Sequence, residues 1–260
     1  MPYSTLKKES TGGNEMLVSI ITVCYNSGKT VAKAIESVLN QTYPEIEYIV
    51  VDGASRDNTV AVAKSYEEQF RAKGYDYKII SEKDNGIYDA MNKGITMARG
   101  ELIGMINSDD WYEPVAVETA VKTHLETGCD LFYADLNLVR DDGSIIVKRS
   151  KLDKFPSTRN WNHPTSFITK KTYEEVGLYR CENMYDDFDL ILRIRAAGKK
   201  VAIRNLILAN FRTGGTSTKK SVKEAVGRCK NRYQNYRKNG YSRLYIIECV
   251  AMETAKLILS

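Results

Sequence analysis

The sequence is poor in the residues that several kinds of functional site require. It has only two histidines, His124 and His163, which excludes a centre built from several imidazoles. Its five cysteines are odd in number and scattered, and no Cys-x-x-Cys occurs, which argues against a disulfide framework and against a zinc site. This cysteine usage favours the reducing environment of the cytoplasm.

The sequence also lacks a long uncharged apolar run, so no membrane-spanning helix is expected. Residues 1–15 are polar and contain no hydrophobic stretch of the kind found in secretory signals, and we predict a mobile tail without function. The chain has 260 residues, of which 43% are hydrophobic and 27% charged. That length is sufficient for one large domain with an appendage.

Short strands rich in valine and isoleucine alternate with helical patterns through the first half of the chain. Such alternation predicts an α/β fold, in which a mostly parallel sheet carries helices on both faces. The expected strands cover residues 18–23, 48–51, 77–80 and 102–106, and the expected helices cover 31–39, 57–70 and 88–98.

The pattern changes in the second half. Apolar segments at 131–134, 136–139 and 145–147 surround an Asp-Gly turn and predict a small antiparallel insertion with a hairpin. The remaining expected elements are a helix over 188–197, a strand over 201–208, and helices from Ser221 onward with a break at 239–240.

The net charge of +5 is unevenly spread. From Thr216 onward ten Lys or Arg face three Glu, a charge of +7, which leaves −2 for the rest of the chain. A basic helical segment of this kind can lie on an anionic membrane surface. It can equally be a solvated helical face packed on the main domain, and both interpretations remain open.

Polar residues follow each of the first four expected strands. Ligands of parallel α/β sheets bind outside the carboxyl ends of the strands, so we expect these loops to form one cleft. Three loops bring carboxylates, and Asp109 is the natural ligand for a divalent cation that offsets their repulsion. Each loop alone could be ordinary turn or capping chemistry, an interpretation that we favour for Asp57. The candidate residues are Thr22, Tyr25, Asn26, Asp52, Asp84, Gly86, Asn107, Ser108, Asp109 and Asp110.

The order of these motifs resembles the family 2 glycosyltransferases, which have the GT-A fold. The resemblance begins in residues 18–59 and continues through Gly86-x-x-x-Ala90-x-Asn92-x-Gly94, Asn107-Ser108-Asp109-Asp110 and Asp186-Asp187-Phe188-Asp189. It implies an inverting enzyme that uses a nucleotide-sugar, commonly a UDP-sugar, with Mn²⁺ or Mg²⁺. Many members build bacterial surface polysaccharides on lipid-linked saccharide acceptors.

The resemblance also divides the chain. It implies a catalytic domain over 16–215, with a nucleotide-binding half at 16–113 and an acceptor half at 114–215, followed by the basic helical segment at 216–260. The implied location is the cytoplasm, at the inner face of the membrane if the basic segment binds lipid.

The family's site residues carry over to matching positions of this sequence. Asp109 matches the metal-binding end of the family's D-x-D motif, with Asp110 beside it as a second candidate metal ligand, and Asp187 matches the proposed general base. Asn107 departs from the family pattern because it replaces the first acid of D-x-D, and Gly53 replaces the second of two acids after the second strand. The implied nucleotide pocket consists of Thr22, Tyr25 and Asn26, with Asp52 at the base or ribose, Asp84 nearby, and Gly86, Asn107 and Ser108 around the donor.

Four further residues each have two interpretations. His163 could touch the acceptor or the diphosphate, or be a structural histidine at a bend. Trp111 could stack on a sugar or belong to the core. Arg212 could clamp the leaving diphosphate with Gly214-Gly215, or lie in a surface turn. Asp186 is a neighbouring candidate for the base, and both it and Asp187 could instead stabilise a helix N-terminus.

Two alternatives within the fold remain: a sugar-phosphate nucleotidyltransferase and a non-catalytic protein that binds nucleotide-sugars. Cys24 to Gly28 is a poor version of the Gly-rich phosphate loop that the first would need. Nucleic-acid binding is not expected, because the main body is not basic and no RNA-binding motif occurs. No motif specifies the sugar, the acceptor, the linkage or the oligomeric state.

Overall fold

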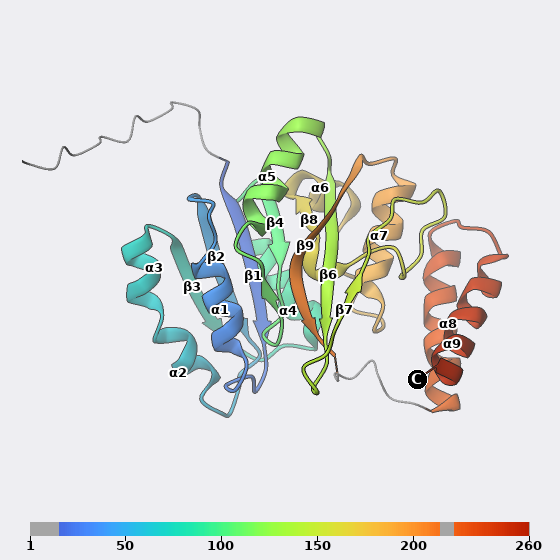
Figure 1. Ribbon diagram of the computed structural model, residues 1–260, viewed down its shortest axis with the longest axis horizontal. Coiled ribbons are helices and arrows are strands. Elements are labelled where there is room, and N and C mark those ends of the chain that lie inside the picture. Colours follow the sequence, from blue (N-terminus) through green and yellow to red (C-terminus); the bar gives the residue numbers. More distant parts are fainter. Residues whose placement is uncertain (1–15, 214–220, 260) are drawn as a thin grey trace, which may run out of the picture.

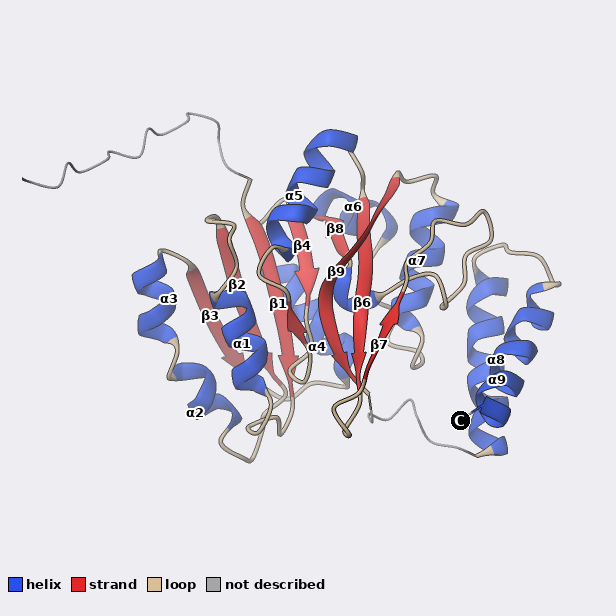
Figure 2. Cartoon of the chain, in the orientation of Figure 1, coloured by secondary structure: helices blue, strands red, loops and turns tan. Residues whose placement is uncertain are grey.

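The computed structural model describes residues 16–213 and 221–259 (Figure 1). Three predictions therefore lie outside the described residues: the mobile tail at 1–15, the contribution of Gly214-Gly215 to a clamp, and the start of the basic segment at Thr216. Within the described residues, nine strands form one sheet with helices on both of its faces (Figure 2).

The first four long strands are parallel and form one side of the sheet. Their spatial order is β3 (Asp76–Ser81), β2 (Ile46–Asp52), β1 (Val18–Cys24) and β4 (Leu102–Met105). β1 pairs with both β2 and β4, so that its carboxyl end is central. The predicted parallel sheet is confirmed.

The other side of the sheet is mixed. Beyond β4, the spatial order of strands in the sheet is β8 (Phe167–Thr169), β6 (Leu131–Val139), β9 (Val201–Arg212) and β5 (Trp111–Tyr112). β8 is antiparallel to both of its neighbours, and β5 is antiparallel to β9. β9 runs parallel to β6, a pairing that the sequence pattern did not predict.

The predicted hairpin is confirmed, because β7 (Ile145–Lys148) pairs antiparallel with β6. The two apolar segments expected at 131–134 and 136–139 are one strand. The register against β9 shifts on either side of Asp135, which is fully buried and is an ion-pair partner of Arg149 at 2.8 Å. The polar residue that divided the sequence pattern therefore marks a bulge inside β6.

Two hydrophobic cores lie on opposite faces of the sheet, since successive β1 side chains alternate between them. Ile20 belongs to the first core and Ile21 to the second. The first face is covered by α1 (Val31–Leu39), α2 (Thr59–Lys64), α3 (Glu67–Lys73) and α5 (Ala116–Thr127). The second face is covered by α4 (Ile87–Met97), α6 (Lys170–Val176) and α7 (Asp186–Ala196).

The single helix predicted over 57–70 is wrong, because α2 ends at Lys64 and α3 begins at Glu67. Ser65 lies at the break, and its hydroxyl donates to the carbonyl of Val62 at 2.7 Å. A serine side chain that binds a nearby backbone carbonyl competes with the helical hydrogen bonds and favours a helix end.

The C-terminal segment forms a hairpin of α8 (Val222–Lys238) and α9 (Tyr245–Leu259) beside α7, at the end of the molecule far from β3 (Figure 1). Tyr236 of α8 is fully buried, and its ring packs edge-on against Phe188 of α7 with centroids 5.5 Å apart. The basic segment therefore packs on the main domain. No helix in the described parts of the chain is long and apolar enough to cross a bilayer.

Candidate active site

A cleft opens at the carboxyl ends of the parallel strands. Its volume is about 880 Å³, which lies within the range of small-molecule sites. Residues after β1, β3, β4 and β9 line it, as do residues of the β6–β7 hairpin. The candidates that line it are Tyr25, Asn26, Asp84, Gly86, Asn107, Ser108, Asp109 and Arg212.

The loop after β1 is tied to the loop after β2. Asn26 adopts a left-handed φ of 50°, its amide N–H donates to the Ser55 hydroxyl at 2.7 Å, and its side-chain oxygen accepts from the N–H of Arg56 at 2.9 Å. These bonds leave Tyr25 at the cleft with 61% of its side chain exposed. An exposed aromatic ring held in a cleft can stack on a planar base.

Asp57 serves the same junction. Its carboxylate accepts from the N–H of Gly28 and from the N–H of Thr59, each at 3.0 Å. The structural interpretation that we favoured for Asp57 is confirmed, since it fixes the turn before α2 and does not line the cleft.

The loops after β2 and β3 meet at Gly53. A Cβ atom on Gly53 would lie 2.3 Å from Oδ2 of Asp84, so the absence of a side chain makes room for that carboxylate. Asp84 also accepts from the N–H of Gly86 at 3.0 Å. Gly86 has a φ of 116°, which favours glycine, and it caps α4. Gly53, which replaces the second of the two acids after the second strand, thus allows the Asp84 carboxylate to lie close to the end of β2.

The two acids after β4 point in different directions. Asp109 is exposed and lines the cleft, whereas Asp110 is fully buried. Asp110 accepts from the N–H of Arg212 at 2.9 Å, which attaches the end of β9 to this loop. Burial and the neighbouring Asp109 raise the pKa of Asp110 well above its ordinary value. Asp110, expected as a second metal ligand, therefore does not line the cleft and instead holds the end of β9 in place behind the cleft wall.

Asn107 supplies the second oxygen at this position. Its amide nitrogen lies 3.5 Å from the Asp110 carboxylate, and its Oδ1 is buried with no hydrogen-bond partner among the described residues. An orphaned buried oxygen beside an exposed carboxylate fits a hard cation such as Mn²⁺ or Mg²⁺. No group of three His, Cys, Asp or Glu that could hold a metal occurs in the described residues, so a cation here would need further oxygens from a bound ligand.

Two expected pocket residues lie beneath the cleft instead of in it. Thr22 is fully buried, and its hydroxyl oxygen accepts from Tyr48 at 2.9 Å. Asp52 is 1% exposed, and it accepts from the N–H of Ser55 at 2.9 Å and from the Ser81 hydroxyl at 2.6 Å. The expectation that three of the first four loops would bring their carboxylates into one cleft is therefore met only by Asp84 and Asp109.

Trp111 also lies outside the residues that line the cleft. It pairs with Asn210 across β5 and β9, and the ammonium of Lys33 sits 3.1 Å from the centroid of its ring. This cation–π contact occupies one ring face. Arg212, by contrast, is exposed and lines the cleft. Burial, and after it the positive charge of Arg212, lowers the pKa of Lys33.

Asp187 lies on the other side of the first turn of α4. Ile87 in that turn lines the cleft, whereas Tyr88 interacts with Asp187. Burial, and after it the charge of Asp187, raises the pKa of the Tyr88 hydroxyl. Asp187 is partly buried, and its carboxylate accepts from the adjacent N–H of Phe188 at 2.7 Å and interacts with the Tyr88 hydroxyl. Burial raises its pKa above the ordinary value, while hydrogen bonds from the N–H of Phe188 and from Tyr88, and the positive charge of Lys148, act in the opposite direction.

The neighbouring acids are engaged structurally. Asp186 is 1% exposed, and its carboxylate accepts from the N–H groups of Glu182 and Asn183. Asp189 is 1% exposed and forms an ion pair with Arg193 at 2.9 Å. Asp187, by contrast, accepts from no arginine and from no loop N–H group among the described hydrogen bonds.

His163 and Asp187 lie together in a closely packed region that leaves no room for a water molecule. Nε2 of His163 lies 3.0 Å from the hydroxyl of Tyr179, and the His163 ring contacts Trp161 edge-on with centroids 5.7 Å apart. Burial lowers the pKa of His163, so the neutral imidazole is favoured. These contacts place His163 beside the candidate base, away from the residues that line the main cleft.

Sequence reasoning missed several residues of both sites. Asp141, at the hairpin tip, and Lys83 line the main cleft, and Tyr88 and Lys148 surround Asp187. The Asp-Gly turn signalled the hairpin, but no sequence signal shows which loop its tip meets. Lys148 follows three apolar residues of an edge strand, a pattern typical of an ordinary solvent-facing lysine.

The family model described as "Glycosyl transferase family 2" matches residues 19–184, more than half of the chain. Curated relatives include a chondroitin synthase of Escherichia coli, 28% identical over 76% of this chain and 30% of its own length. A hyaluronan synthase of Pasteurella multocida is 29% identical over 70% of this chain and 19% of its own. The chain therefore spans about a third or less of the length of these relatives.

Solved structures share the architecture at low sequence identity. TarS of S. aureus, in complex with UDP-GlcNAc, has a TM-score of 0.66 at 15% identity, and the match covers 93% of this chain and 72% of the TarS chain. The mannosyltransferase PcManGT of Pyrobaculum calidifontis, in complex with GDP-Man and Mn²⁺, has a TM-score of 0.67 at 15% identity, with coverages of 94% and 75%.

Proposed function

Because the chain belongs to the family 2 glycosyltransferases and has the GT-A fold, we propose that it transfers a sugar, with inversion, from a UDP-sugar to an acceptor hydroxyl in cell-surface polysaccharide synthesis. One observation carries this proposal. The first turn of α4 contributes Ile87 to the cleft that suits a nucleotide and the adjacent Tyr88 to the surroundings of Asp187. A donor in the cleft and an acceptor near Asp187 would therefore meet at the first turn of α4.

The donor would bind with its nucleotide over Tyr25 and Asn26 and its diphosphate toward Asp109. The cleft offers three carboxylates against two cations, and negative groups so close to a diphosphate repel it unless a metal cation intervenes. Asp109 and Oδ1 of Asn107 would hold Mn²⁺ or Mg²⁺, which when bound neutralises charge on the diphosphate. Arg212 is placed at the same wall to add a second positive charge.

Asp187 would act on the acceptor. As the acceptor oxygen bonds to the anomeric carbon, the bond from that carbon to the diphosphate oxygen breaks, UDP leaves, and the hydroxyl proton passes to the Asp187 carboxylate. A base performs best when its pKa lies near the working pH, and burial moves the pKa of Asp187 in that direction. Neutral His163 and Tyr88 would orient the acceptor from the same side.

The direct test is a panel of UDP-, GDP- and dTDP-sugars in a thermal-shift assay with Mn²⁺, because a true donor raises Tm by mass action. The preferred donor is then incubated with saccharide acceptors, and the product is examined by proton NMR. We expect free UDP and a linkage of inverted anomeric configuration. Release of pyrophosphate would indicate a nucleotidyltransferase, and a retained configuration would contradict the role of Asp187.

We further propose that the outward face of α9 rests on an anionic membrane surface, as a lipid-linked acceptor would require. Exposed apolar side chains recur along this helix at helical spacing, whereas Glu253 is turned inward and buried. α8 adds exposed Lys223 and Lys230. The exposed apolar members are Ile246, Ile247, Val250, Leu257 and Ile258, and exposed Leu244 directly precedes the helix.

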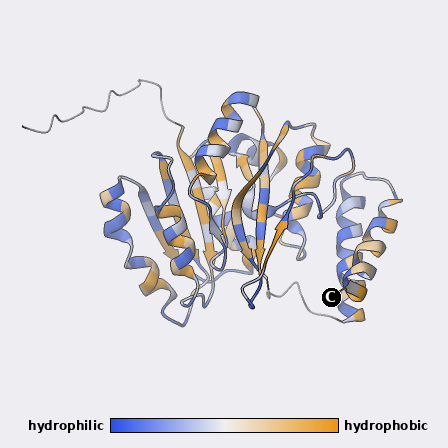
Figure 3. Ribbon diagram, in the orientation of Figure 1, coloured by the Kyte–Doolittle hydropathy of each residue, from blue (hydrophilic) through white to orange (hydrophobic). Residues whose placement is uncertain are grey.

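Charge favours a lipid surface over a second copy of this chain. The segment from Thr216 onward carries +7, so self-association would bring like charges together, whereas anionic lipid attracts them. Figure 3 shows that α9 forms the outer edge of the molecule together with the mostly hydrophilic α8. A face that combines apolar side chains with neighbouring lysines is typical of peripheral membrane helices.

The test is co-sedimentation with phosphatidylcholine vesicles with and without phosphatidylglycerol. We expect the protein to pellet with the anionic vesicles only, and Ile247→Glu combined with Ile258→Glu to abolish pelleting. Leu125→Glu is the matched control, because Leu125 is 68% exposed on α5, on the opposite face of the sheet. Equal pelleting of both variants, or a dimer that the α9 substitutions disrupt, would contradict the proposal.

A further inference from the structure

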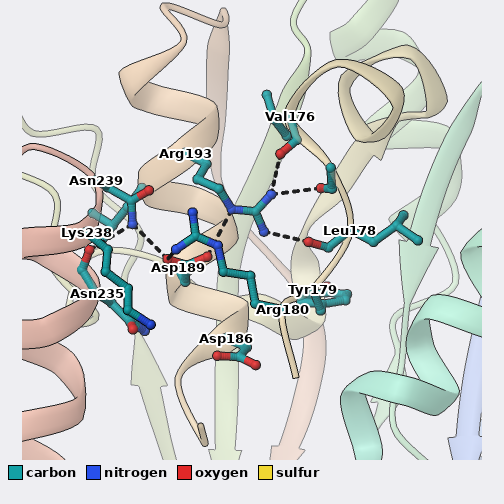
Figure 4. Close-up of polar contacts among 12 residues, drawn as sticks. Val176, Leu178, Tyr179, Arg180, Asp186, Asp189, Arg193, Asn235, Lys238 and Asn239 are labelled. Atoms are coloured by element: carbon teal, nitrogen blue, oxygen red, sulfur yellow. Dashed lines mark hydrogen bonds and ion pairs between the residues drawn. The ribbon is translucent and has the colours of Figure 1, made fainter. Parts of the chain in front are cut away.

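The segment that leads into α7 directly precedes the candidate base and is held by side chains of α4, α7 and α8, of which Figure 4 shows those of α7 and α8. It runs from Gly177 to Tyr185 and ends where α7 begins with Asp186 and Asp187. It has no regular secondary structure, so its position depends on side chains that bind its backbone. The contacts that hold it therefore set where Asp187 lies.

The first anchor is Arg193, two turns further along α7. Its guanidinium donates to the carbonyl oxygens of Gly177 at 2.9 Å and Leu178 at 2.7 Å, and its Nε donates to Asp189 at 2.9 Å. Figure 4 shows this fork reaching from the helix to the segment. Arg193 therefore fixes the beginning of the segment to α7. The end of the segment, next to Asp186, is held by other groups.

The second anchor comes from α8. Asn235 is 1% exposed, and its Nδ2 donates to the carbonyl of Tyr185 at 2.8 Å while its Oδ1 accepts from Nδ2 of Asn183 at 3.1 Å. One turn later, Nδ2 of Asn239 donates to Oδ1 of Asp189 at 2.7 Å. These two asparagines contact residues on both sides of Asp187 in the sequence.

We infer that α8 positions the general base, with Asn235 and Asn239 as positioning residues that hold the first turn of α7 against the acceptor side of the site. The inference rests on the proposed role of Asp187. Neither asparagine lines the nucleotide cleft, so they should influence proton transfer and leave donor binding alone. Displacement of a reacting group by about 1 Å can cost roughly a hundredfold in rate.

A purely structural role for these asparagines predicts a different result. Loss of fold stability lowers the concentration of active enzyme but leaves the behaviour of each folded molecule unchanged. A positioning role instead alters the environment of Asp187, which is faced by Tyr88 of α4, His163 and Tyr179, Lys148 of β7, and its neighbour Asp186. Loosening the first turn of α7 would admit water, which reduces the effect of burial and lowers the pKa of Asp187.

The experiment compares Asn239→Ala and Asn235→Ala with Gln234→Ala in the full chain. Gln234 is exposed on the same helix and is the matched control. Active sites are titrated with UDP and Mn²⁺, so that rates refer to folded protein only. For Asn239→Ala we expect kcat to fall roughly tenfold to a hundredfold, UDP affinity to stay within about twofold, and the acid limb of the kcat profile to move to lower pH.

The inference is overturned if both asparagine variants have the same kcat per titrated site as Gln234→Ala and the acid limb of their kcat profiles has not moved. Asn239 is only partly buried, so its variant should fold even if Asn235→Ala does not. Asp187→Asn separates the two levels of the argument. If that variant is fully active, the proposed base is wrong; if it is inactive while Asn239→Ala behaves as the control, only the positioning role fails.

Discussion

Replacing Asp187 by Asn should remove transfer while leaving the fold intact. The substitution keeps the size of the side chain and an oxygen that can still accept from the N–H of Phe188, the contact observed at 2.7 Å. It removes the ability to take a proton. Loss of a general base costs roughly a hundred- to ten-thousand-fold in rate, which corresponds to about 2.7 to 5.4 kcal/mol of activation free energy.

The sign of the stability change distinguishes this role from a structural one. Burial raises the pKa of Asp187, so the folded state binds its proton more tightly than the unfolded state does. Above that pKa the ionised carboxylate therefore costs stability, and a neutral Asn removes the cost. We expect an unchanged or increased free energy of unfolding at neutral pH, together with an unchanged UDP affinity.

The two neighbouring acids provide matched comparisons. Asn at position 186 has one acceptor oxygen for two backbone donors, the N–H groups of Glu182 and Asn183, so Asp186→Asn should cost about 1–3 kcal/mol. Asp189→Asn breaks a buried pair with Arg193 and should cost about 3–5 kcal/mol.

The assay measures UDP release per titrated active site and urea unfolding for all three Asn variants. The rate should collapse in Asp187→Asn, and stability should fall in the other two. The wild-type rate should also fall as the pH drops below the raised pKa of Asp187, because protonation removes the base. A fully active Asp187→Asn variant would show that Asp187 is not the base. If turnover is lost instead in Asp186→Asn or Asp189→Asn alone, the substituted residue is the base.

Three further changes test other parts of the molecule. Asp109→Asn should abolish the Mn²⁺-dependent part of UDP affinity in calorimetry, and unchanged affinity would refute the metal assignment. Gly53→Ala should weaken donor binding, seen as a raised KM, because the new Cβ would displace the Asp84 carboxylate from its position 2.3 Å away; a KM equal to wild type would show that Asp84 is not needed there. Glu253→Gln should lower the free energy of unfolding by about 3–5 kcal/mol in urea, because the buried carboxylate pairs with Arg228 and Arg232 at 2.8 Å each. These arginines also lower the pKa of Glu253, so this stabilisation should disappear as the pH falls below the ordinary range of Glu. If Glu253→Gln lowers the free energy of unfolding by less than about 1 kcal/mol, the hairpin docks through its apolar contacts alone.

The sequence by itself determined the order of the main elements and the edge of the sheet that carries function. Short strands rich in valine and isoleucine are buried on both faces, so their alternation with helical patterns specifies a parallel sheet. Since parallel strands end at the same edge, polar residues after β1, β3 and β4 had to meet there. The motifs that place the chain in its family lie in those same loops.

Only the tertiary structure decided which of the polar residues reach the cleft. Asp109 and Asp110 are adjacent in the sequence, yet the N–H of Arg212 draws Asp110 inward and leaves Asp109 exposed. Asp52 is likewise turned away by Ser55 and Ser81. The direction of a loop side chain depends on hydrogen bonds from segments distant in the sequence, and sequence periodicity carries no information about them.

The same reason applies to the acids of α7 and to the basic C-terminal segment. Asp187 differs from Asp186 and Asp189 because the latter two are occupied by a loop backbone and by Arg193. Arg228 and Arg232 belong to a stretch whose composition suggested a solvated face, yet both are buried against Glu253. Composition fixes how many charges a segment has, whereas packing against α7 and between the two helices decides which of them face the interior.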